Sequence, residues 1–269
     1  MTPGPDASAA FAFSLQVHAF YSELMLAASE VHEAGSSEGS SLGGKLLYAA
    51  ELDGPGRALV IAGNVAGCAS LAATADAAAQ KQAIRDAVVD FLVTSLDEAL
   101  RILKNEIRKR ETVAVCVGAA PEAVEREMLE RGVLPDLLRP AERPGPSTEA
   151  FVKEGARRVG TDVANEDRVL VAWQVTEAPA RWLPHINAIA LECLCADNLA
   201  SRRWLRLAPR YMGRLSQGMH VLAQDRESAE RLVDAIRNEV DHGNIPVPVE
   251  ILLRGPGPQP EHRLRLDKS

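Results

Sequence analysis

Short apolar runs alternate with longer, helix-type stretches through the first half of the chain. Each run is rich in Val, Leu, Ile or Ala, as buried strands are, and turn residues separate the runs from the helices. Strands that alternate with helices in this way predict an α/β fold with a Rossmann-like, mostly parallel sheet. The predicted strands are residues 45–52, 58–62, 88–93, 112–117 and 133–138.

Local signals predict several helix boundaries. Ser95 and Glu98 stand three residues apart before an apolar-periodic stretch, which is the pattern of a capping box. Pro121 follows a glycine turn and suits the first position of a helix. Near the N-terminus, residues 14–34 show helical spacing of their apolar positions, and Ser14 can cap that helix.

One stretch, residues 57–74, organises the prediction of function. It opens with an apolar run at residues 58–62, which we interpret as a strand. A glycine turn follows at residues 63–67, and small residues from Cys68 onward predict a helix. A strand, a turn and a helix in this order present backbone N–H groups to a phosphate or carboxylate. A tight turn without a ligand fits the same residues equally well.

The second half of the chain follows a different order of elements. Apolar runs predict four strands, and two amphipathic stretches predict helices. The order βαββαβ is that of a ferredoxin-like α+β domain, an antiparallel sheet with two helices on one face. The predicted strands are residues 168–176, 203–208, 219–224 and 247–254, and the predicted helices are residues 179–198 and 227–241.

Proline and glycine mark the predicted boundaries. We expect a Rossmann-like domain at residues 1–138, a proline-rich linker at 139–165 and the ferredoxin-like domain at 166–269. Residues 36–44, rich in Gly and Ser, are expected to form a flexible loop, either a plain connector or a flap over the glycine turn. The first dozen residues and the tail from Gly255 are expected to lack regular structure.

Composition excludes some classes of protein. A net charge of −7 over 269 residues argues against nucleic-acid binding, and no apolar run is long enough to span a membrane. The four cysteines show neither zinc-type spacing nor the density of a disulfide framework. The N-terminus lacks the basic region of a signal peptide. We therefore expect a cytoplasmic protein without a structural metal.

Five sequence blocks follow one another in an order typical of a known family. The chain resembles the NAD-binding core of urocanase, the NAD-dependent urocanate hydratase, over residues 40–138. This resemblance implies a Rossmann-like core and NAD or a related nucleotide as cofactor. The blocks are GNVAGCASLAAT at residues 63–74, LDEAL at 96–100, GAAPE at 118–122, RGV at 131–133 and PD at 135–136.

The departures from the family pattern concern its chemistry. Asn64 and Ala66 stand where the family has glycines, and Ala119 stands where it has asparagine. The interval before residue 96 is shorter than in the family, so we expect the strand that carries the family's ribose-contacting acid to be missing. The family's catalytic region, with its cysteine, has no counterpart in residues 166–269. Urocanase chemistry is therefore not expected.

Two hypotheses for the function remain open. The first is a small-molecule site for a nucleotide or a small anion. The second is a structural or interaction protein that has kept the fold without a ligand and forms a homodimer through its C-terminal domain. The residues predicted to bind the cofactor are Gly63, Asn64, Gly67, Cys68, Gly118 and Glu122.

Enzymatic activity is left open by the sequence. No Ser-His-Asp, metal-ligand or paired-carboxylate arrangement can be recognised from the spacing of the residues. Cys68 has two interpretations: a reactive thiol at a helix N-terminus, or a small buried residue, which is the commoner role of a free cysteine.

Overall fold

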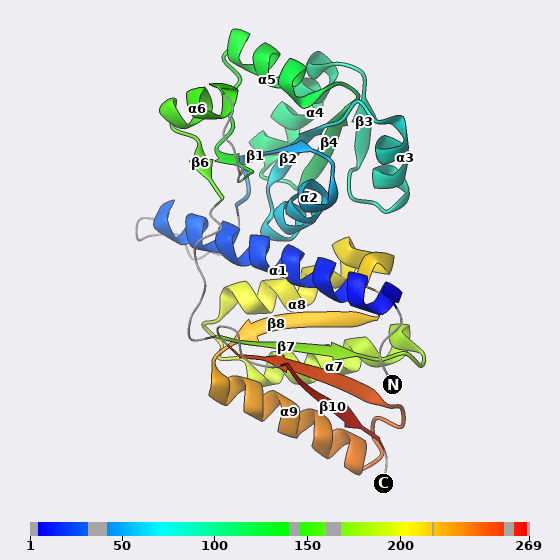
Figure 1. Cartoon of the computed structure of the whole chain (residues 1–269). Helices are drawn as coiled ribbons and strands as arrows, with labels where there is room; N and C mark the ends of the chain where they lie inside the picture. The colour runs from blue at the N-terminus through cyan, green and yellow to red at the C-terminus, as the bar shows by residue number, and fades with distance from the viewer. Residues whose placement is uncertain are drawn as a thin grey trace. The chain divides into compact units, whose positions relative to one another are not determined.

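The computed structural model of the chain describes residues 5–31, 42–139, 146–159, 168–216, 218–255 and 261–267. They form two compact units, each with its own sheet (Figure 1). The parallel-sheet unit comprises Ala19–Thr161, and the antiparallel-sheet unit comprises Met1–His18 together with Asp162–Ser269. One helix, α1 (Pro5–Val31), contributes residues to both units.

Six strands of the described residues form the parallel sheet, in the order β3-β4-β2-β1-β5-β6. Every neighbouring pair is parallel, which confirms the predicted α/β class and the Rossmann-like sheet. The strands are β1 (Leu46–Glu51), β2 (Ala69–Ala73), β3 (Phe91–Val93), β4 (Val113–Val117), β5 (Leu137–Leu138) and β6 (Arg157–Arg158). The helices are α2 (Gly54–Ala66), α3 (Ala77–Arg85), α4 (Leu96–Lys109), α5 (Pro121–Glu130) and α6 (Pro146–Lys153).

Helices cover both faces of this sheet, as expected for strands that are apolar on both sides. On one face, Leu46 and Tyr48 belong to a buried cluster that includes residues of α4 and α5. On the other face, α2 approaches so closely that a Cβ at Gly63 would lie 2.6 Å from Leu47 Cδ2. The sheet is therefore the middle layer of a doubly wound arrangement.

The helix boundaries predicted at Ser95 and Pro121 are confirmed, whereas Ser14, which was predicted as a cap, lies inside α1. Ser95 is the N-cap of α4 and accepts a hydrogen bond from Glu98 N at 3.4 Å, while Glu98 Oε2 accepts one from Thr94 N at 2.9 Å. Pro121 begins α5. These signals act within a few residues, so they do not depend on the rest of the fold.

The predicted order of elements in residues 57–74 is wrong. The run at residues 58–62 lies in α2, Gly67 is the C-cap of that helix, and the residues after Cys68 form β2. The whole run is buried, so α2 shows no polar face and its residues have the apolar density of a buried strand. The stretch is a helix, a turn and a strand, the reverse of the prediction.

The second sheet has the order β10-β9-β7-β8, with every neighbouring pair antiparallel. Three of the predicted strands are confirmed, as are both helices. The strands are β7 (Val169–Gln174), β8 (Met219–Gln224), β9 (Val249–Arg254) and β10 (His262–Leu266). The helices are α7 (Pro179–Cys193), α8 (Leu199–Met212) and α9 (Arg226–Asp241), with a 3-10 turn at Gly213–Ser216.

The strand predicted at residues 203–208 is wrong, because this segment lies in α8. The polar and apolar positions of six residues can fit both the two-residue period of a strand and the 3.6-residue period of a helix. Only a longer segment of the sequence distinguishes the two. The buried positions of α8 recur at helical spacing: Ser201, Trp204, Leu205, Ala208 and Met212. The resulting order, βααβαββ, is not the predicted ferredoxin-like βαββαβ order, although the α+β character of the unit is as predicted.

Residues 5–12 are helical, contrary to the prediction that the first dozen residues lack regular structure. The helix α1 begins at Pro5, ahead of the predicted start at Ser14. Phe11 and Leu15 pack against a cluster on the antiparallel sheet that contains Ala172, Met219 and Val221. This packing on the apolar face of the sheet stabilises the N-terminal part of α1 beyond its own helix propensity.

Two further expectations about boundaries need correction. Residues 139–165 were predicted as a linker with one short helix; α6 is that helix, but β6 also lies within them and pairs with β5 of the parallel sheet. The tail after Gly255 was predicted to be unstructured, but β10 pairs with β9. Apart from Leu42, Gly43 and Gly44, the predicted loop at residues 36–44 lies outside the described residues. None of the helices described here has the length and apolar character needed to cross a membrane.

Candidate functional site

The predicted site at residues 63–68 lies at the C-terminal end of α2. Gly63 and Asn64 are inside the helix, and Gly67 adopts the left-handed conformation, with φ of 99°, that ends it. Gly67 N and Cys68 N both donate to Gly63 O, at 2.8 and 2.9 Å. A helix C-terminus carries partial negative charge, so this turn is the wrong end of a helix for a phosphate.

The six predicted residues are not brought together. Gly63, Asn64, Gly67 and Cys68 lie before β2, at the amino edge of the sheet, whereas Gly118 and Glu122 follow β4 at the carboxyl edge. The strands β2 and β4 are parallel, with Ala69 opposite Val113 and Ala73 opposite Val117. The two groups of residues are therefore separated by the length of the strands.

The residues at the amino edge have structural roles. Asn64 is buried and donates from Nδ2 to Val88 O at 3.3 Å. Gly63 allows α2 to approach Leu47 and Ser70. Cys68 is fully buried, which agrees with the interpretation of a small core residue and leaves its thiol inaccessible.

The turn from β1 into α2 has the geometry that was predicted for residues 63–67. Asp53 is the N-cap of α2, and its Oδ1 accepts a hydrogen bond from Gly56 N at 2.8 Å. A Cβ at Gly56 would lie 1.9 Å from Glu51 O, so only glycine fits this position. The sequence signal is the turn at residues 53–56 after an apolar strand, which was interpreted as a turn between two strands and not as the start of a helix.

The strand order places a switch point beside β1. The chain leaves β1 toward β2 on one side and later returns to β5 on the other. In open α/β sheets, ligands bind outside the carboxyl ends of the strands at such a point. The candidate site of this protein is therefore the carboxyl edge of the sheet, where the turns after β1, β2 and β4 meet.

Arg139, which directly follows β5, spans the switch point. Its guanidinium donates to Glu51 O at 3.0 Å and to Asp53 Oδ2 at 2.9 Å, and it lies 2.8 Å from Asp53 Oδ1. The Arg139 side chain is only 19% exposed, compared with 46% for Asp53. The ends of β1 and β5 are thus joined by a two-pronged ion pair.

The turn after β2 carries one acid, Asp76, at the start of α3. Asp76 is exposed, stands 20 residues after Gly56 and caps α3 by accepting from Ala78 N at 2.8 Å. In dinucleotide-binding folds, an acid at about this spacing binds the ribose hydroxyls. Thr74, which is buried, is fixed beside it because Gln80 Nε2 donates to Thr74 O at 2.9 Å.

The helix α5, which follows β4, brings two acids, Glu122 and Glu125, near Tyr48 of β1. Tyr48 Oη lies 3.4 Å from Pro121 O and 3.3 Å from Glu125 Oε1. Burial, together with the carboxylates of Glu125 and Glu122, raises the pKa of Tyr48 far above its usual value, so the hydroxyl keeps its proton. Burial also raises the pKa of Glu125. These groups give the carboxyl edge an acidic character.

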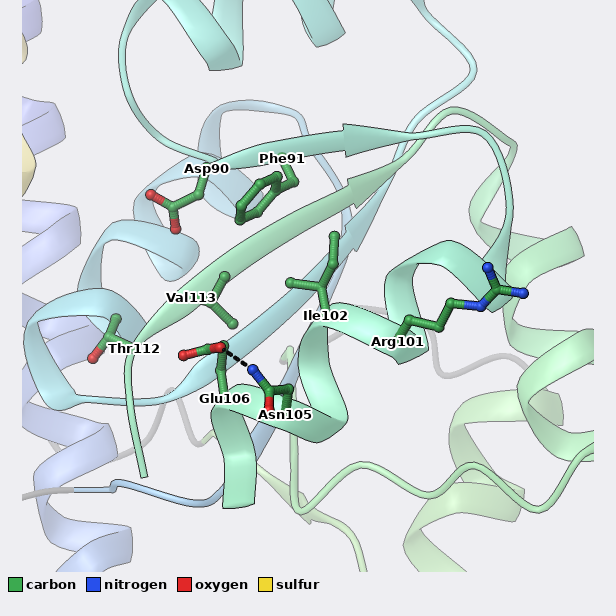
Figure 2. A pocket seen from close by; sticks show the side chains of 8 residues that line it. All are labelled: Asp90, Phe91, Arg101, Ile102, Asn105, Glu106, Thr112 and Val113. Carbon is green, nitrogen blue, oxygen red and sulfur yellow. Dashed lines mark hydrogen bonds between the residues drawn. The ribbon is translucent and has the colours of Figure 1, made fainter. Parts of the chain in front are cut away.

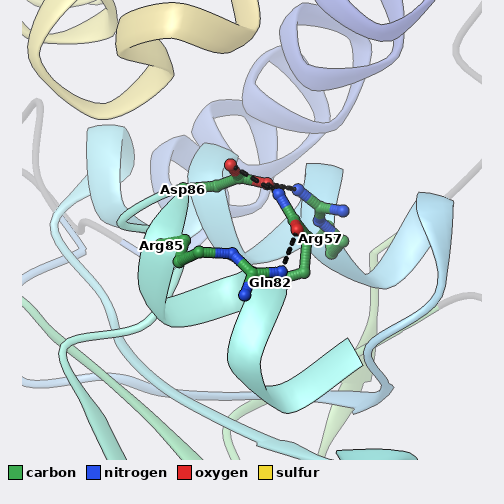
Figure 3. A network of polar contacts seen from close by, with 4 residues as sticks. All are labelled: Arg57, Gln82, Arg85 and Asp86. Atoms are coloured by element: carbon green, nitrogen blue, oxygen red, sulfur yellow. Dashed lines mark hydrogen bonds and ion pairs between the residues drawn. The ribbon is translucent and has the colours of Figure 1, made fainter. Parts of the chain in front are cut away.

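The first turn of α2 is also tied to α3 through the network in Figure 3. Arg57 forms an ion pair with Asp86, which is the C-cap of α3. Gln82 Nε2 donates to both carboxylate oxygens of Asp86, at 2.9 and 2.8 Å. Because Arg57 is engaged in this way, its guanidinium is held at α3 rather than at the carboxyl edge.

A surface pocket lies apart from these turns, between β3 and the C-terminal half of α4 (Figure 2). Its volume is about 790 Å³. Phe91, Ile102 and Val113 form its apolar part, and Arg101 and Glu106 lie at its rim. None of the six predicted site residues lines it. Among the described residues, no group of three or more His, Cys, Asp or Glu could hold a metal ion.

Residues 18–140 match the family model described as the urocanase Rossmann-like domain. The match confirms the resemblance predicted from the sequence and extends it into α1. It covers the strands β1 to β5 and the helices α2 to α5, so it includes all the turns of the carboxyl edge. Within this segment, the block at residues 63–74 is a helix end and a strand, not the nucleotide-binding turn.

Proposed function

We propose that the chain binds a nucleoside-type small molecule at the carboxyl edge of its parallel sheet and that it does not hydrate urocanate. The observation that carries the proposal is the meeting of three turns at one edge, those after β1, β2 and β4. They hold Gly56, Asp76 and Gly118, and a nucleoside bound across such an edge contacts the same three turns in dinucleotide-binding folds.

Each turn has a physical role in this proposal. The absence of a side chain at Gly56 keeps the end of β1 and the start of α2 close together. The exposed carboxylate of Asp76 accepts hydrogen bonds from the two ribose hydroxyls. A Cβ at Gly118 would lie only 3.3 Å from Gln80 Nε2, so the glycine lets the Gln80 side chain lie between the turns after β2 and β4, where its amide can face a ligand.

Hydration is left out of the proposal for two reasons. The family's catalytic region has no counterpart in residues 166–269. Of the two cysteines in the parallel sheet and its turns, Cys68 is fully buried, and burial raises the pKa of Cys116 to about 12. A thiol that stays protonated at neutral pH is a poor nucleophile.

Calorimetric titration of the full chain with adenosine tests the proposal. Replacement of Asp76 by Asn keeps a helix cap but removes the charge, and we expect adenosine affinity to fall by about tenfold or more. Asp234→Asn is the matched control, because Asp234 is an exposed acid of α9 in the other unit. Adenosine binding that is undetectable, or equal in the Asp76→Asn and wild-type proteins, would contradict the proposal.

The second candidate is a fold retained without a ligand, serving interaction or self-association. One observation favours it: the N-terminus of α2 is already satisfied by the carboxylate of Asp53. Mass spectrometry of the purified, denatured protein distinguishes the two candidates. A nucleoside or nucleotide released in a stoichiometric amount supports the first candidate, and a clean spectrum together with no response to adenosine supports the second.

A further inference from the structure

We infer that Asp53 and Arg139 close the phosphate position of the carboxyl edge, so that the site takes an uncharged nucleoside and rejects nucleotides and dinucleotides. The inference rests on the proposed function and specifies its ligand. A Rossmann-type dinucleotide site places a pyrophosphate against the first turn of the helix that follows β1. In this protein that helix is α2.

The backbone N–H groups that would donate to a phosphate already donate to Asp53. Gly56 N donates to Asp53 Oδ1 at 2.8 Å, and Arg57 N donates to Asp53 O at 3.0 Å. Pro55 has no N–H group to offer. Of the first four residues of α2, three therefore have no N–H available to a phosphate, and a ligand would have to displace the Asp53 side chain to gain the N–H of Gly56.

The negative charge of Asp53 also disfavours a phosphate at the N-terminus of α2. The Asp53 carboxylate occupies the positive end of α2, where a phosphate would otherwise be stabilised. Arg139, the cation that contacts Asp53, is held by both oxygens of this carboxylate and by Glu51 O. An incoming pyrophosphate would meet the negative charge of Asp53 while Arg139 is already paired, so phosphate is disfavoured by repulsion as well as by missing donors.

The ribose side of the site is open by contrast. Asp76 is exposed, and its cap to Ala78 N uses only one of its oxygens, at 2.8 Å from Oδ1. The same edge thus accepts the diol of a nucleoside and refuses the phosphates attached to it. This arrangement does not fit NAD, whose two ribose groups are joined by a pyrophosphate.

The test compares adenosine, AMP, ADP and NAD by calorimetry against three full-length proteins. We expect the wild type to bind adenosine at least about tenfold more tightly than ADP or NAD. Asp53→Asn keeps an N-cap of the same shape but removes the charge and releases Arg139, so the ratio should shift toward ADP by about tenfold or more. The affinity for adenosine itself should stay within about threefold.

Arg139→Met is the matched control for loosening of the turn. It breaks the same ion pair but keeps the carboxylate of Asp53, so ADP and NAD should remain excluded. Equal gains of ADP binding in both variants would overturn the inference, as would a wild type that prefers ADP or NAD to adenosine while the proposed function stands.

Failure of the proposed function gives a different pattern. If neither the wild type nor Asp53→Asn binds any of the four compounds, the nucleoside site is wrong and the inference falls with it. If the wild type binds none and Asp53→Asn gains ADP alone, the closing role of the Asp53 carboxylate is supported and the nucleoside function is not.

Discussion

At the scale of single residues, Gly56 decides whether the carboxyl edge can form. A Cβ at this position would lie 1.9 Å from Glu51 O, which belongs to the backbone and cannot move aside. We expect Gly56→Ala to lower the free energy of unfolding of the parallel-sheet unit by about 3 kcal/mol, as overpacking against backbone does.

Gly54→Ala is the internal control for this prediction. A Cβ at Gly54 would meet no atom within 4 Å, and its φ is not in the left-handed region. The change should alter the free energy of unfolding by less than about 1 kcal/mol. Urea unfolding followed by far-ultraviolet circular dichroism measures both, and similar losses for the two variants would disprove the backbone clash.

Two buried histidines make the stability of the antiparallel-sheet unit depend on pH. Burial, with a smaller effect of Arg168, lowers the pKa of His18 to about 3, and burial lowers that of His220 to about 4. In the unfolded chain both titrate near 6.5. The unfolded state therefore binds more protons below pH 6.5, and stability falls as the pH drops from 6.5 toward the folded pKa values.

From pH 7 to pH 5, we expect a loss of roughly 2 kcal/mol for each histidine, about 4 kcal/mol together. Tryptophan fluorescence during urea unfolding reports this unit, because Trp173, Trp182 and Trp204 all lie in it. The His18→Gln variant keeps an acceptor for Ala223 N and should lose about half of the pH effect. An unchanged pH dependence in the double variant with His220→Gln would contradict the prediction.

At the scale of elements, β8 is an edge strand whose outward backbone groups are covered by side chains. Trp204 Nε1 of α8 donates to Val221 O at 2.6 Å, and Ala223 N donates to His18 Nε2 of α1 at 3.3 Å. The two rings also contact each other edge to face, with centroids 4.8 Å apart. Two helices thus satisfy the edge and protect it from pairing with another strand.

Trp204→Phe tests how much the hydrogen bond from Trp204 to the edge strand β8 stabilises the unit. The ring is kept but Val221 O loses its buried donor, so we expect the free energy of unfolding to fall by about 1–3 kcal/mol. Trp182→Phe serves as the control, because its contacts with Arg181 and His185 are made by the ring, and the expected change is below about 1 kcal/mol. Equal effects in denaturant titrations would show that the Trp204 bond contributes nothing specific.

At the scale of the whole molecule, the antiparallel-sheet unit is built from two separate parts of the chain. Phe11 and Leu15 of α1 pack on one face of its sheet, 160 or more positions before most of that sheet in sequence. Phe11→Ala with Leu15→Ala should therefore lower the tryptophan-reported stability by about 2 kcal/mol.

The control lies in the second half of the same helix. Leu26 is 40% exposed, and Leu26→Ala should leave the tryptophan-reported transition unchanged. If residues 166–269 folded independently, as the sequence predicted, the Phe11 and Leu15 variant would also leave that transition unchanged.

The homodimer stays a prediction, and sedimentation equilibrium at low micromolar concentration is its measurement. We expect a dimer mass, and a monomer at every concentration would contradict it. Trp173 is fully buried and donates to Asn187 Oδ1 at 3.2 Å, so a charge placed at Trp173 should unfold the unit rather than test an interface. The apolar face of β7 contacts α1 of the same chain.

The sequence by itself determined the elements whose signals are local. The cap at Ser95, the proline that begins α5 and the polar–apolar periodicity of α4 each depend on a few neighbouring residues, and the structure has them as predicted. The order of the strands and helices also predicted the parallel sheet. The resemblance to urocanase lies in the same part of the chain and is confirmed over residues 18–140.

Only the tertiary structure decided where the site lies. The helix α2 and the strand β2 are buried on all sides, so neither shows the polar–apolar periodicity that distinguishes a helix from a strand. The sequence therefore predicted a strand, a turn and a helix where the structure has a helix, a turn and a strand. Asp53 and Arg139 stand 86 positions apart, and they meet because β1 and β5 are neighbours in the sheet. Contacts of this kind follow from strand order, which no local pattern of residues encodes.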